Sequence, residues 1–588
     1  MPFVGAYTRR VRFALSQPVA IGPEIFLMIV IAGVIGATVM ISREFVAPQH
    51  TGIIIDLSLW SLPKYTMLSL ARGVAAYLLS LVFTLVYGTV AAHNRRAEKV
   101  MLPALDVLQA IPVLGFLPGL VLALIALFPA HEIGLELACI IMIFTAQVWN
   151  MTFSFHASLR NVPQALREVA ALQNLNGWQM FKLVEVPSAM IGLVWNSMMS
   201  MAGGWFFLTV NEAFTLGNRD YRLPGIGAYM NEAIQQDDKV AMVGAVVAMV
   251  IMIIVVDQVF WRPIVVWSQR FKVDDSTDAD LPKSWALDIL MQSKLFRTTV
   301  DKLHKNTPDL AARIVMQSKR HTEHPVIRKI LLVTRFVLRW TALILFAAFL
   351  AWGLWSLVRL LVALPIYDSV KHEDWVTVIL ALLASFLRTT AAVVVGMLWA
   401  LPVGILIGLS DKWSQRLQPV IQVVASFPAP MLFPIVIAIL LTLHIPFTVG
   451  CTALMLLGAQ WYILFNVIAG ARSIPSDLKE VTRLNTMSRF ERWTRLYIPC
   501  VYPHLVTGLV TAAGGAWNAT IVSEYMQVQG KTLSAFGLGS LISHATAGGQ
   551  YSLLCAGVVL MALFVVGINR IFWKRLYRLA ENRYSLNT

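Results

Sequence analysis

Twelve apolar stretches, separated by short polar segments, run along this chain. Each is close to the roughly 20 residues that an α-helix needs to cross a bilayer. We therefore expect an all-α polytopic membrane protein with about twelve transmembrane helices. The stretches lie near residues 24–42, 67–92, 104–128, 134–157, 188–212, 240–261, 336–358, 376–409, 419–443, 447–468, 501–523 and 551–573.

The composition agrees with this pattern. Of the 588 residues, 57% are hydrophobic and 13% are charged, whereas soluble chains average roughly 25% charged residues. The first apolar stretch continues through Ile41 without a small-residue cleavage site, so we expect a retained anchor rather than a removed signal peptide.

The positions of the charges predict the orientation. Lys and Arg number 47 against 32 Asp and Glu, which gives a formal net charge of +15. If the N-terminus is cytoplasmic and the spans alternate, 35 of the 47 basic residues fall in inside segments, as the positive-inside rule requires. We therefore expect both termini in the cytoplasm, at a bacterial inner membrane. The positive charge is explained by topology and membrane lipids, without nucleic acid.

The chain also repeats itself. The halves match at an offset of 316 residues and, beyond a four-residue deletion near 443–446, at an offset of 312. Each copy holds six spans in the same order and begins inside, so we expect two parallel six-helix repeats. The matched pairs include Arg72 with Arg388, Pro112 with Pro428, Gly203 with Gly515, Trp205 with Trp517, and Glu212 with Glu524.

A polar linker separates the copies. It contains a predicted amphipathic helix opened by Pro282 and Ser284. We interpret the linker as a tether lying on the membrane surface, with a regulatory element as the alternative. The predicted boundaries are 1–265 for the first repeat with its core at 60–260, 266–330 for the cytoplasmic linker, and 331–588 for the second repeat with its core at 375–575.

The longest repeated inside loops, 160–187 and 471–499, point to a function. In each, a glutamate and a proline are nineteen residues apart, and aromatic residues follow the glutamate by ten and thirteen positions, on one helical face. The pattern predicts helix, turn and helix, ending at a proline that opens the next span. Such a helix is a docking element or, alternatively, an interfacial connector. The matched residues are Glu168, Trp178, Phe181 and Pro187 in the first loop and Glu480, Phe490, Trp493 and Pro499 in the second.

These loops resemble the coupling-loop motif of ABC importer permeases, Glu-Ala-Ala with a glycine six residues after the glutamate. The whole chain looks like two fused permeases of the nitrate, sulfonate, taurine and bicarbonate group. Ala170 and Ala171 keep the motif, but Asn174 and Thr486 replace its glycine. Asn tolerates a left-handed turn better than β-branched Thr. We therefore expect the second loop to turn differently and the two docking sites to be unequal.

The resemblance implies a type I importer-like permease fold. Each loop would dock on a cytoplasmic ABC ATPase dimer, which binds ATP and Mg, and a periplasmic or lipid-anchored solute-binding protein would deliver the solute. This chain would be the non-catalytic permease subunit, without a cofactor or metal of its own. The resemblance implies a small solute, an anion such as nitrate, bicarbonate, taurine, a sulfonate or another organic acid.

Repeated charges near the outer ends of the spans mark a candidate path. Arg72 and Arg388 fall in the second span of each repeat, and Glu212 and Glu524 end the fifth. Charges in a membrane are costly and point to function. They could form an outer gate or contact an anion through the planar guanidinium. Alternatively, they snorkel to headgroups or form static pairs.

Small and aromatic residues near the middle of the fifth spans form a second candidate. The glycines either allow close helix approach or open a space with tryptophans as facing walls. Prolines can break the third spans and expose backbone groups to a lined path. These residues are Gly203, Trp205 and Pro112 in the first repeat and Gly515, Trp517 and Pro428 in the second.

Two other functions stay open at this point. A self-sufficient secondary transporter or channel would need charges near the middle of the membrane, whereas the repeated charges lie near its outer face. A membrane-bound enzyme would need a cluster of His, Cys or carboxylates, and the histidines are scattered and unrepeated.

Overall fold

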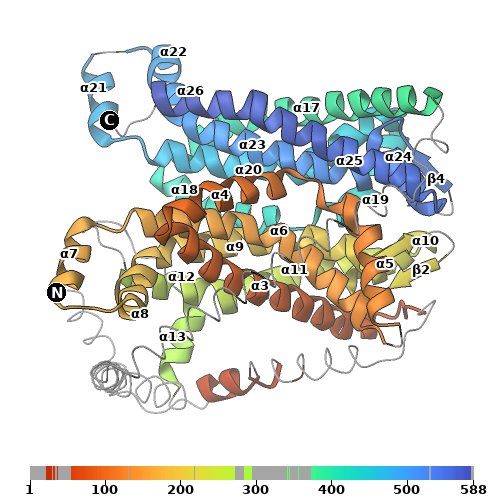
Figure 1. The fold of residues 1–588 in the computed structure, drawn as a ribbon, viewed down its shortest axis with the longest axis horizontal. Helices are drawn as coiled ribbons and strands as arrows, with labels where there is room; N and C mark the ends of the chain where they lie inside the picture. Colours follow the sequence, from red (N-terminus) through yellow and green to blue (C-terminus); the bar gives the residue numbers. More distant parts are fainter. Residues whose placement is uncertain are drawn as a thin grey trace. The chain divides into compact units, whose positions relative to one another are not determined.

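The chain forms two compact units in the computed structural model (Figure 1). Unit 1 is Met1–Gly36 with Lys283–Lys371, and unit 2 is Ala37–Pro282 with His372–Thr588. The repeats therefore share unit 2. The predicted boundaries 1–265, 266–330 and 331–588 stay predictions. The structure describes residues 22–29, 31–33, 36, 54–129, 131–216, 219–271, 284–293, 341, 344, 348, 355, 372–485, 487–528 and 531–584.

The first repeat is a set of long helices with one short β-hairpin (Figure 1). Its elements are η1 (Leu59–Ser61), α3 (Leu62–His93), α4 (Arg95–Ala110), η2 (Val113–Phe116), α5 (Leu117–Leu127), α6 (Ile133–Arg160), α7 (Gln164–Leu172), α8 (Gly177–Met180), the π-helix η3 (Phe181–Glu185), α9 (Val186–Asn211), β1 (Ala213–Leu216), β2 (Arg219–Arg222), α10 (Ile226–Gln235), α11 (Lys239–Val255), the π-helix η4 (Val256–Trp261), α12 (Arg262–Ser268) and η5 (Gln269–Phe271).

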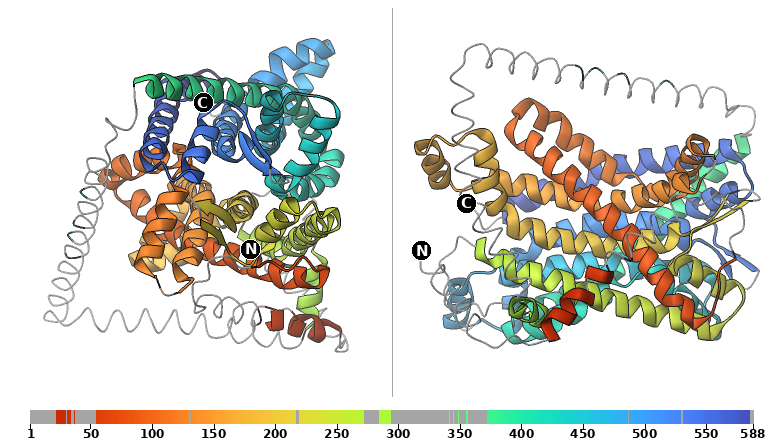
Figure 2. Two further views of the ribbon diagram at one scale, coloured as in Figure 1. Left: turned by 90° about the vertical axis from the view of Figure 1, so that its right-hand side faces the viewer. Right: turned by 90° about the horizontal axis from the view of Figure 1, so that it is seen from below.

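The second repeat follows the same order of elements, which confirms the predicted all-α duplication. Seen along the helices, the two repeats form two groups (Figure 2). The elements are α17 (His372–Gly408), α18 (Asp411–Ser426), α19 (Ala429–Thr442), α20 (Phe447–Arg472), α21 (Ser476–Leu484), α22 (Arg489–Arg492), the π-helix η6 (Trp493–Tyr497), α23 (Ile498–Ser523), β3 (Tyr525–Val528), β4 (Lys531–Ser534), α24 (Leu538–Ala547), α25 (Tyr551–Ile568), the π-helix η7 (Asn569–Trp573) and α26 (Lys574–Tyr584).

Two β-hairpins are a feature that the hydrophobic pattern does not predict. β1 pairs antiparallel with β2, with Ala213 opposite Arg222, and β3 pairs with β4, with Tyr525 opposite Ser534. Each hairpin connects a long helix to a short one. The sequence offset of 312 relates the two hairpins residue by residue.

Seven helices in the described part of the chain are long and apolar enough to cross a membrane. Two bent helix pairs raise this number to nine if each pair is one span. Helix α9 lies where a span is expected but is not among them, because Asn196, Ser197 and Ser200 lower its central hydropathy. The predicted span at 24–42 is described in part, at 24–29, 31–33 and 36, and the span at 336–358 lies largely outside the described residues.

The third spans are bent rather than straight, as their prolines predict. Segments Arg95–Gln109 and Val113–Ile125 meet at 82°, and Lys412–Ser426 and Ala429–Thr442 meet at 84°. Pro112 and Pro428 stand at the breaks with extended ψ angles of 106° and 116°. Proline lacks an N–H and disfavours helix in the preceding residue, so the helix stops there.

Matched close contacts hold each repeat together. A Cβ on Gly88 would lie 2.7 Å from the Phe155 ring, and one on Gly404 would lie 2.6 Å from Val467. These two contacts are related by the repeat offsets. They let α3 lie against α6, and α17 against α20, at a distance that a larger residue would not allow.

The described part of the linker contains one short helix in unit 1. Helix α13 (Trp285–Gln292) begins at Ser284, whose hydroxyl accepts a hydrogen bond from the Leu287 N–H, as the sequence predicts. Within this unit, the Trp285 ring lies edge-on to Phe26 at 6.0 Å. The rest of the predicted amphipathic helix lies outside the described residues.

Candidate functional site: a shared cavity, two coupling loops and two buried ion-pair networks

A cavity of about 190 Å³ lies between the two repeats of unit 2. Helices α9 and α23 supply much of its wall, and both bent third spans reach it. Most of the lining is apolar and rich in rings. The aromatic lining residues are Trp149, Phe206, Phe207, Phe427, Trp461, Tyr462, Phe465, Trp517 and Trp573.

The polar groups of the cavity are mostly amides. Asp106 is the one charged side chain among the described lining residues, and Gln422 stands at the matching position of the second repeat. Amide, indole and hydroxyl groups donate hydrogen bonds without carrying charge. The polar lining residues are Asp106, Gln109, Thr145, Asn150, Gln422, Tyr462, Thr511, Asn518 and Asn569.

The predicted path residues are only partly brought together here. Gly203, Gly515, Trp517 and Pro428 line the cavity. Trp205 does not line this cavity, so its role as a facing wall stays a prediction. Its side chain is 2% exposed, and its ring is so close that a Cβ on residue 73 would lie 2.8 Å away.

Pro112 does not line the cavity either, but the break that it causes does. The next residue, Val113, lines the cavity, and its backbone N–H donates a 2.8 Å hydrogen bond to Oδ1 of Asn518. The broken third span thus presents a backbone donor to a side chain of the other repeat. An unbroken helix would have used that donor internally.

Arg72 lies in a fully buried ion-pair network of the first repeat. Its guanidinium donates two 2.7 Å hydrogen bonds to Glu136 and one of 2.8 Å to Glu212. It also donates to the carbonyl oxygen of Pro224 at 2.9 Å. Glu212 in turn accepts hydrogen bonds from the Ser69 hydroxyl and from the first turn of α10.

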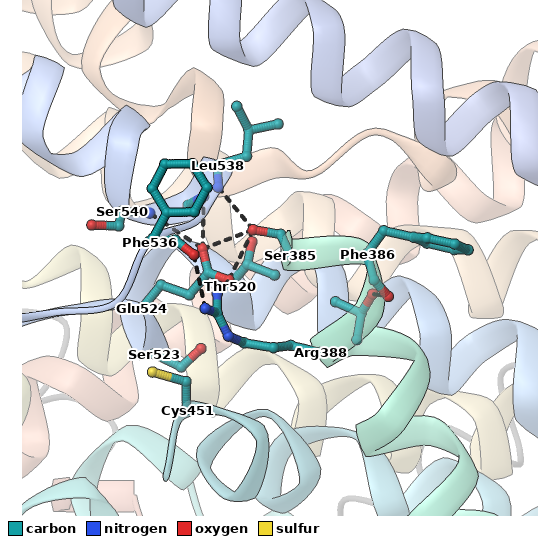
Figure 3. A network of polar contacts seen from close by, with 12 residues as sticks. Ser385, Phe386, Arg388, Cys451, Thr520, Ser523, Glu524, Phe536, Leu538 and Ser540 are labelled. Atoms are coloured by element: carbon teal, nitrogen blue, oxygen red, sulfur yellow. Dashed lines mark hydrogen bonds and ion pairs between the residues drawn. The ribbon is translucent and has the colours of Figure 1, made fainter. Parts of the chain in front are cut away.

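The second repeat builds the same network with one carboxylate fewer (Figure 3). Arg388 donates to Glu524 and to the Phe536 carbonyl oxygen, both at 2.8 Å. Glu524 accepts from the Ser385 hydroxyl and from the Gly539 N–H at the start of α24. The repeat offset places Thr448, which is exposed, where the first repeat has Glu136.

Each network fixes a short helix to its own repeat. A Cβ on Gly225 or Gly537 would lie 2.3 Å from the carboxylate of Glu212 or Glu524, so only glycine permits this approach. The carboxylate then caps the positive end of the following helix. Neither arginine lines the cavity, and each pairs within its own repeat. This is the geometry of a static pair rather than of a gate between repeats.

The first coupling loop is helix, turn and helix, as predicted. Asn174 ends α7 with a φ of 51°, the left-handed conformation that a glycine would adopt easily. Helix α8 begins with a capping box between Asn176 and Gln179. It continues through the π-helix η3 into α9, which opens with Pro187.

The second coupling loop repeats these features. Ser488 and Glu491 form its capping box, and η6 leads into α23, which opens with Pro499. Thr486 lies outside the described residues. The Met487 N–H bonds to the Thr482 carbonyl oxygen, just as the Leu175 N–H bonds to that of Ala170. The expected difference in turn geometry at Thr486 stays a prediction.

Both loops lie at the same end of the repeats (Figures 1 and 2), and each exposes an aromatic side chain. Trp178 is 63% exposed and Phe490 is 77% exposed. The Trp178 ring stacks on the Phe181 ring at 5.6 Å. Trp493, which matches Phe181 in the repeat, lies edge-on to Tyr497 at 6.1 Å. Glu168, Ala171 and Glu480 are exposed as well, whereas Ala170 is buried.

No group of three His, Cys, Asp or Glu side chains that could hold a metal occurs among the described residues. The dipeptide Lys531-Thr532, which could end a phosphate-loop motif, lies in strand β4 of a β-hairpin. A phosphate loop needs a strand, a glycine-rich turn and a helix. The hairpin does not provide that arrangement.

The structure thus contains two matched helical repeats around a shared cavity, with one candidate coupling loop in each repeat. The chain belongs to the family described as binding-protein-dependent transport system inner membrane component, which matches residues 84–260 and 400–585. The family's domain thus occurs twice in the chain, in agreement with the repeat. Members of this family are multi-pass membrane proteins.

Individual relatives match one part of the chain. It is 30% identical over 181 residues to the nitrate import permease protein NrtB of Synechococcus elongatus and 28% identical over 142 residues to the bicarbonate transport system permease protein CmpB of the same organism. These matches cover 30% and 24% of this chain. They span only 60% and 50% of the relatives' own lengths.

Several residues of the site are not predicted from the sequence. Glu136 is a charge within a span, which is a signal for function, but it has no partner at the repeat offset. Ser69 and Ser385 do match at the offset of 316 and were detectable in that way. Asp106 and Asn518 carry no motif, and only folding brings them to the cavity.

Proposed function

We propose that this chain is the permease subunit of an ATP-driven importer and that it forms the path for a small solute. The observation that carries the proposal is the duplicated coupling loop. Two matched helices expose Trp178 and Phe490 and continue without a break into the cavity-lining helices α9 and α23. A force applied at these loops is thereby transmitted to the cavity wall.

The partners follow from this function. Each loop docks on one subunit of a cytoplasmic ABC ATPase dimer, which binds the ATP and Mg. A solute-binding protein delivers the solute to the opposite face. The positive-inside distribution supports cytoplasmic termini in a bacterial inner membrane. The chain itself is non-catalytic and needs no cofactor.

The solute in this proposal is a small anion. Two relatives are named as permeases for nitrate and for bicarbonate, and these names support this class of solute. The amide and indole donors of the cavity are suited to hydrogen-bond an oxyanion without fixing it by charge. Organic acids, taurine and sulfonates belong to the same class of solute.

Co-purification and uptake test the proposal. The wild-type chain is expected to co-purify with an ATPase, and the double variant Trp178→Ala, Phe490→Ala to lose it. Trp60→Ala is the matched control, because Trp60 is 93% exposed but lies at the start of α3, away from both loops. Transport by this chain alone in liposomes without ATP would instead identify a secondary transporter or channel.

A further inference from the structure

The two coupling segments, 177–185 and 489–497, share a backbone but differ in charge. The first has one cation, Lys182, and one carboxylate, Glu185, whereas the second has three arginines and one carboxylate, Glu491. The arginines recur at intervals of three residues, the spacing of neighbours on a helix surface. Arg489, Arg492 and Arg495, here called the basic ridge, stand where the first segment has Gly177, Met180 and Leu183.

The basic ridge is accessible and carries three cations against the one carboxylate of its segment. Arg489 and Arg495 are exposed, and Arg492 is half-buried. The nearest carboxylate in sequence, Glu491, accepts hydrogen bonds from the backbone and hydroxyl of Ser488 in the capping box. In the described part of the chain, no carboxylate lies within ion-pair distance of the three guanidinium groups.

The three matching positions of the first segment, Gly177, Met180 and Leu183, are uncharged, and the exposed Lys182 is the one cation beside them. Leu183 is 52% exposed, and Trp178 stacks on Phe181 beside it. Glu185 is buried and lies 2.8 Å from Nε2 of His93, so its charge does not face outward. The two docking surfaces therefore offer a partner different chemistry at equivalent places.

We propose that the second coupling segment docks by placing the basic ridge against acidic side chains of its ATPase subunit, whereas the first docks through apolar and stacking contacts. This inference rests on the proposed function. Arg489 directly precedes Phe490, the most exposed aromatic of the segment, so a protein that covers Phe490 also meets the ridge. Exposed charge pairs steer association and are screened by salt, unlike apolar contacts.

Binding of the ATPase at increasing salt tests this inference. The full chain is placed in nanodiscs of neutral lipid, and the Kd for its ATPase is measured. The exchange R489G/R492M/R495L gives the second segment the residues of the first. We expect it to raise the Kd about tenfold at low salt, because three exposed ion pairs are lost. The Kd of this variant should also depend less on the salt concentration. The variant R489K/R492K/R495K keeps the charge and stays within about twofold.

A matched control removes the same number of charges elsewhere. R570G/R575M/R578L strips three arginines from η7 and α26 and is expected to leave binding unchanged. Unchanged salt dependence in the ridge exchange overturns the inference. So does a weakening that appears only in discs of anionic lipid, because the ridge then binds headgroups. If the wild-type chain binds no ATPase at all, the proposed function itself fails.

Discussion

Replacing Arg72 by Gln should be among the most destabilising single changes in the first repeat. Arg72 is fully buried and supplies three hydrogen bonds to two carboxylates and one to a carbonyl oxygen. Glu136 and Glu212 would then face each other in a buried site without a cation. Removing one partner from a buried ion pair costs about 3–5 kcal/mol, and we expect a loss of that size.

Arg388→Gln supplies the internal comparison. Arg388 faces one carboxylate, Glu524, which also keeps its bonds from Ser385 and from the first turn of α24. The side chain of Arg388 is 14% exposed, so water can reach the site. We expect a loss of about 2 kcal/mol, the typical value of hydrogen bonds to a charged group.

The measurement is unfolding of the purified protein in detergent, by heat or by increasing SDS, followed by intrinsic tryptophan fluorescence. The double variant Arg72→Gln, Glu136→Gln is the decisive sample, because it removes one of the two uncompensated charges and should be more stable than Arg72→Gln alone. Equal losses for Arg72→Gln and Arg388→Gln, or no recovery in the double variant, would refute the electrostatic reasoning.

Uptake of the folded variants separates a static pair from a gate. If the networks only fix α10 and α24, Arg388→Gln that folds should import solute at close to the wild-type rate per folded molecule. Full loss of uptake in a folded protein would instead place this arginine in the transport cycle.

Three further changes address other parts of unit 2. Gly225→Ala forces a methyl group to within 2.3 Å of the Glu212 carboxylate and should cost about 1–3 kcal/mol in unfolding, whereas Gly119→Ala, with open space around it, should cost nothing. Asn174→Val should weaken ATPase co-purification and expose the first loop to protease, because a β-branched residue at a φ of 51° costs about 1–2 kcal/mol; Asn174→Gly should be neutral. Gly515→Leu places its Cβ 3.2 Å from the Tyr462 ring in the cavity wall and should reduce uptake per folded molecule.

Periodic features of this protein are visible in its sequence. The long apolar helices, the offsets between the repeats, the proline breaks and the coupling loops all recur or follow a helical period, and the structure contains them. The left-handed turn at Asn174 follows from the motif as well, because few residues other than Gly and Asn accept that conformation.

Features that depend on long-range contact are not visible in this way. The hairpins β1–β2 and β3–β4 have strands of four residues, too short for an alternating pattern to appear. Glu136 has no charged counterpart in the second repeat, so a search for charges that recur in both repeats does not identify it. Trp517 lines the cavity and Trp205 does not, because sequence symmetry between them does not fix which way a side chain turns.

The two repeats have similar backbone structures but differ in the charges of their side chains at equivalent positions. At equivalent positions of the two repeats, Glu136 corresponds to Thr448 and Asp106 corresponds to Gln422. The basic ridge of the second repeat corresponds to uncharged residues in the first. In a permease built from two identical chains, any such substitution would appear twice, on both sides of the path. Fusing the halves removes that constraint, because each copy can change alone while the stoichiometry stays fixed. The scaffold is therefore symmetric where the packing is matched, whereas the cavity lining, the coupling segments and the buried ion-pair networks differ between the repeats.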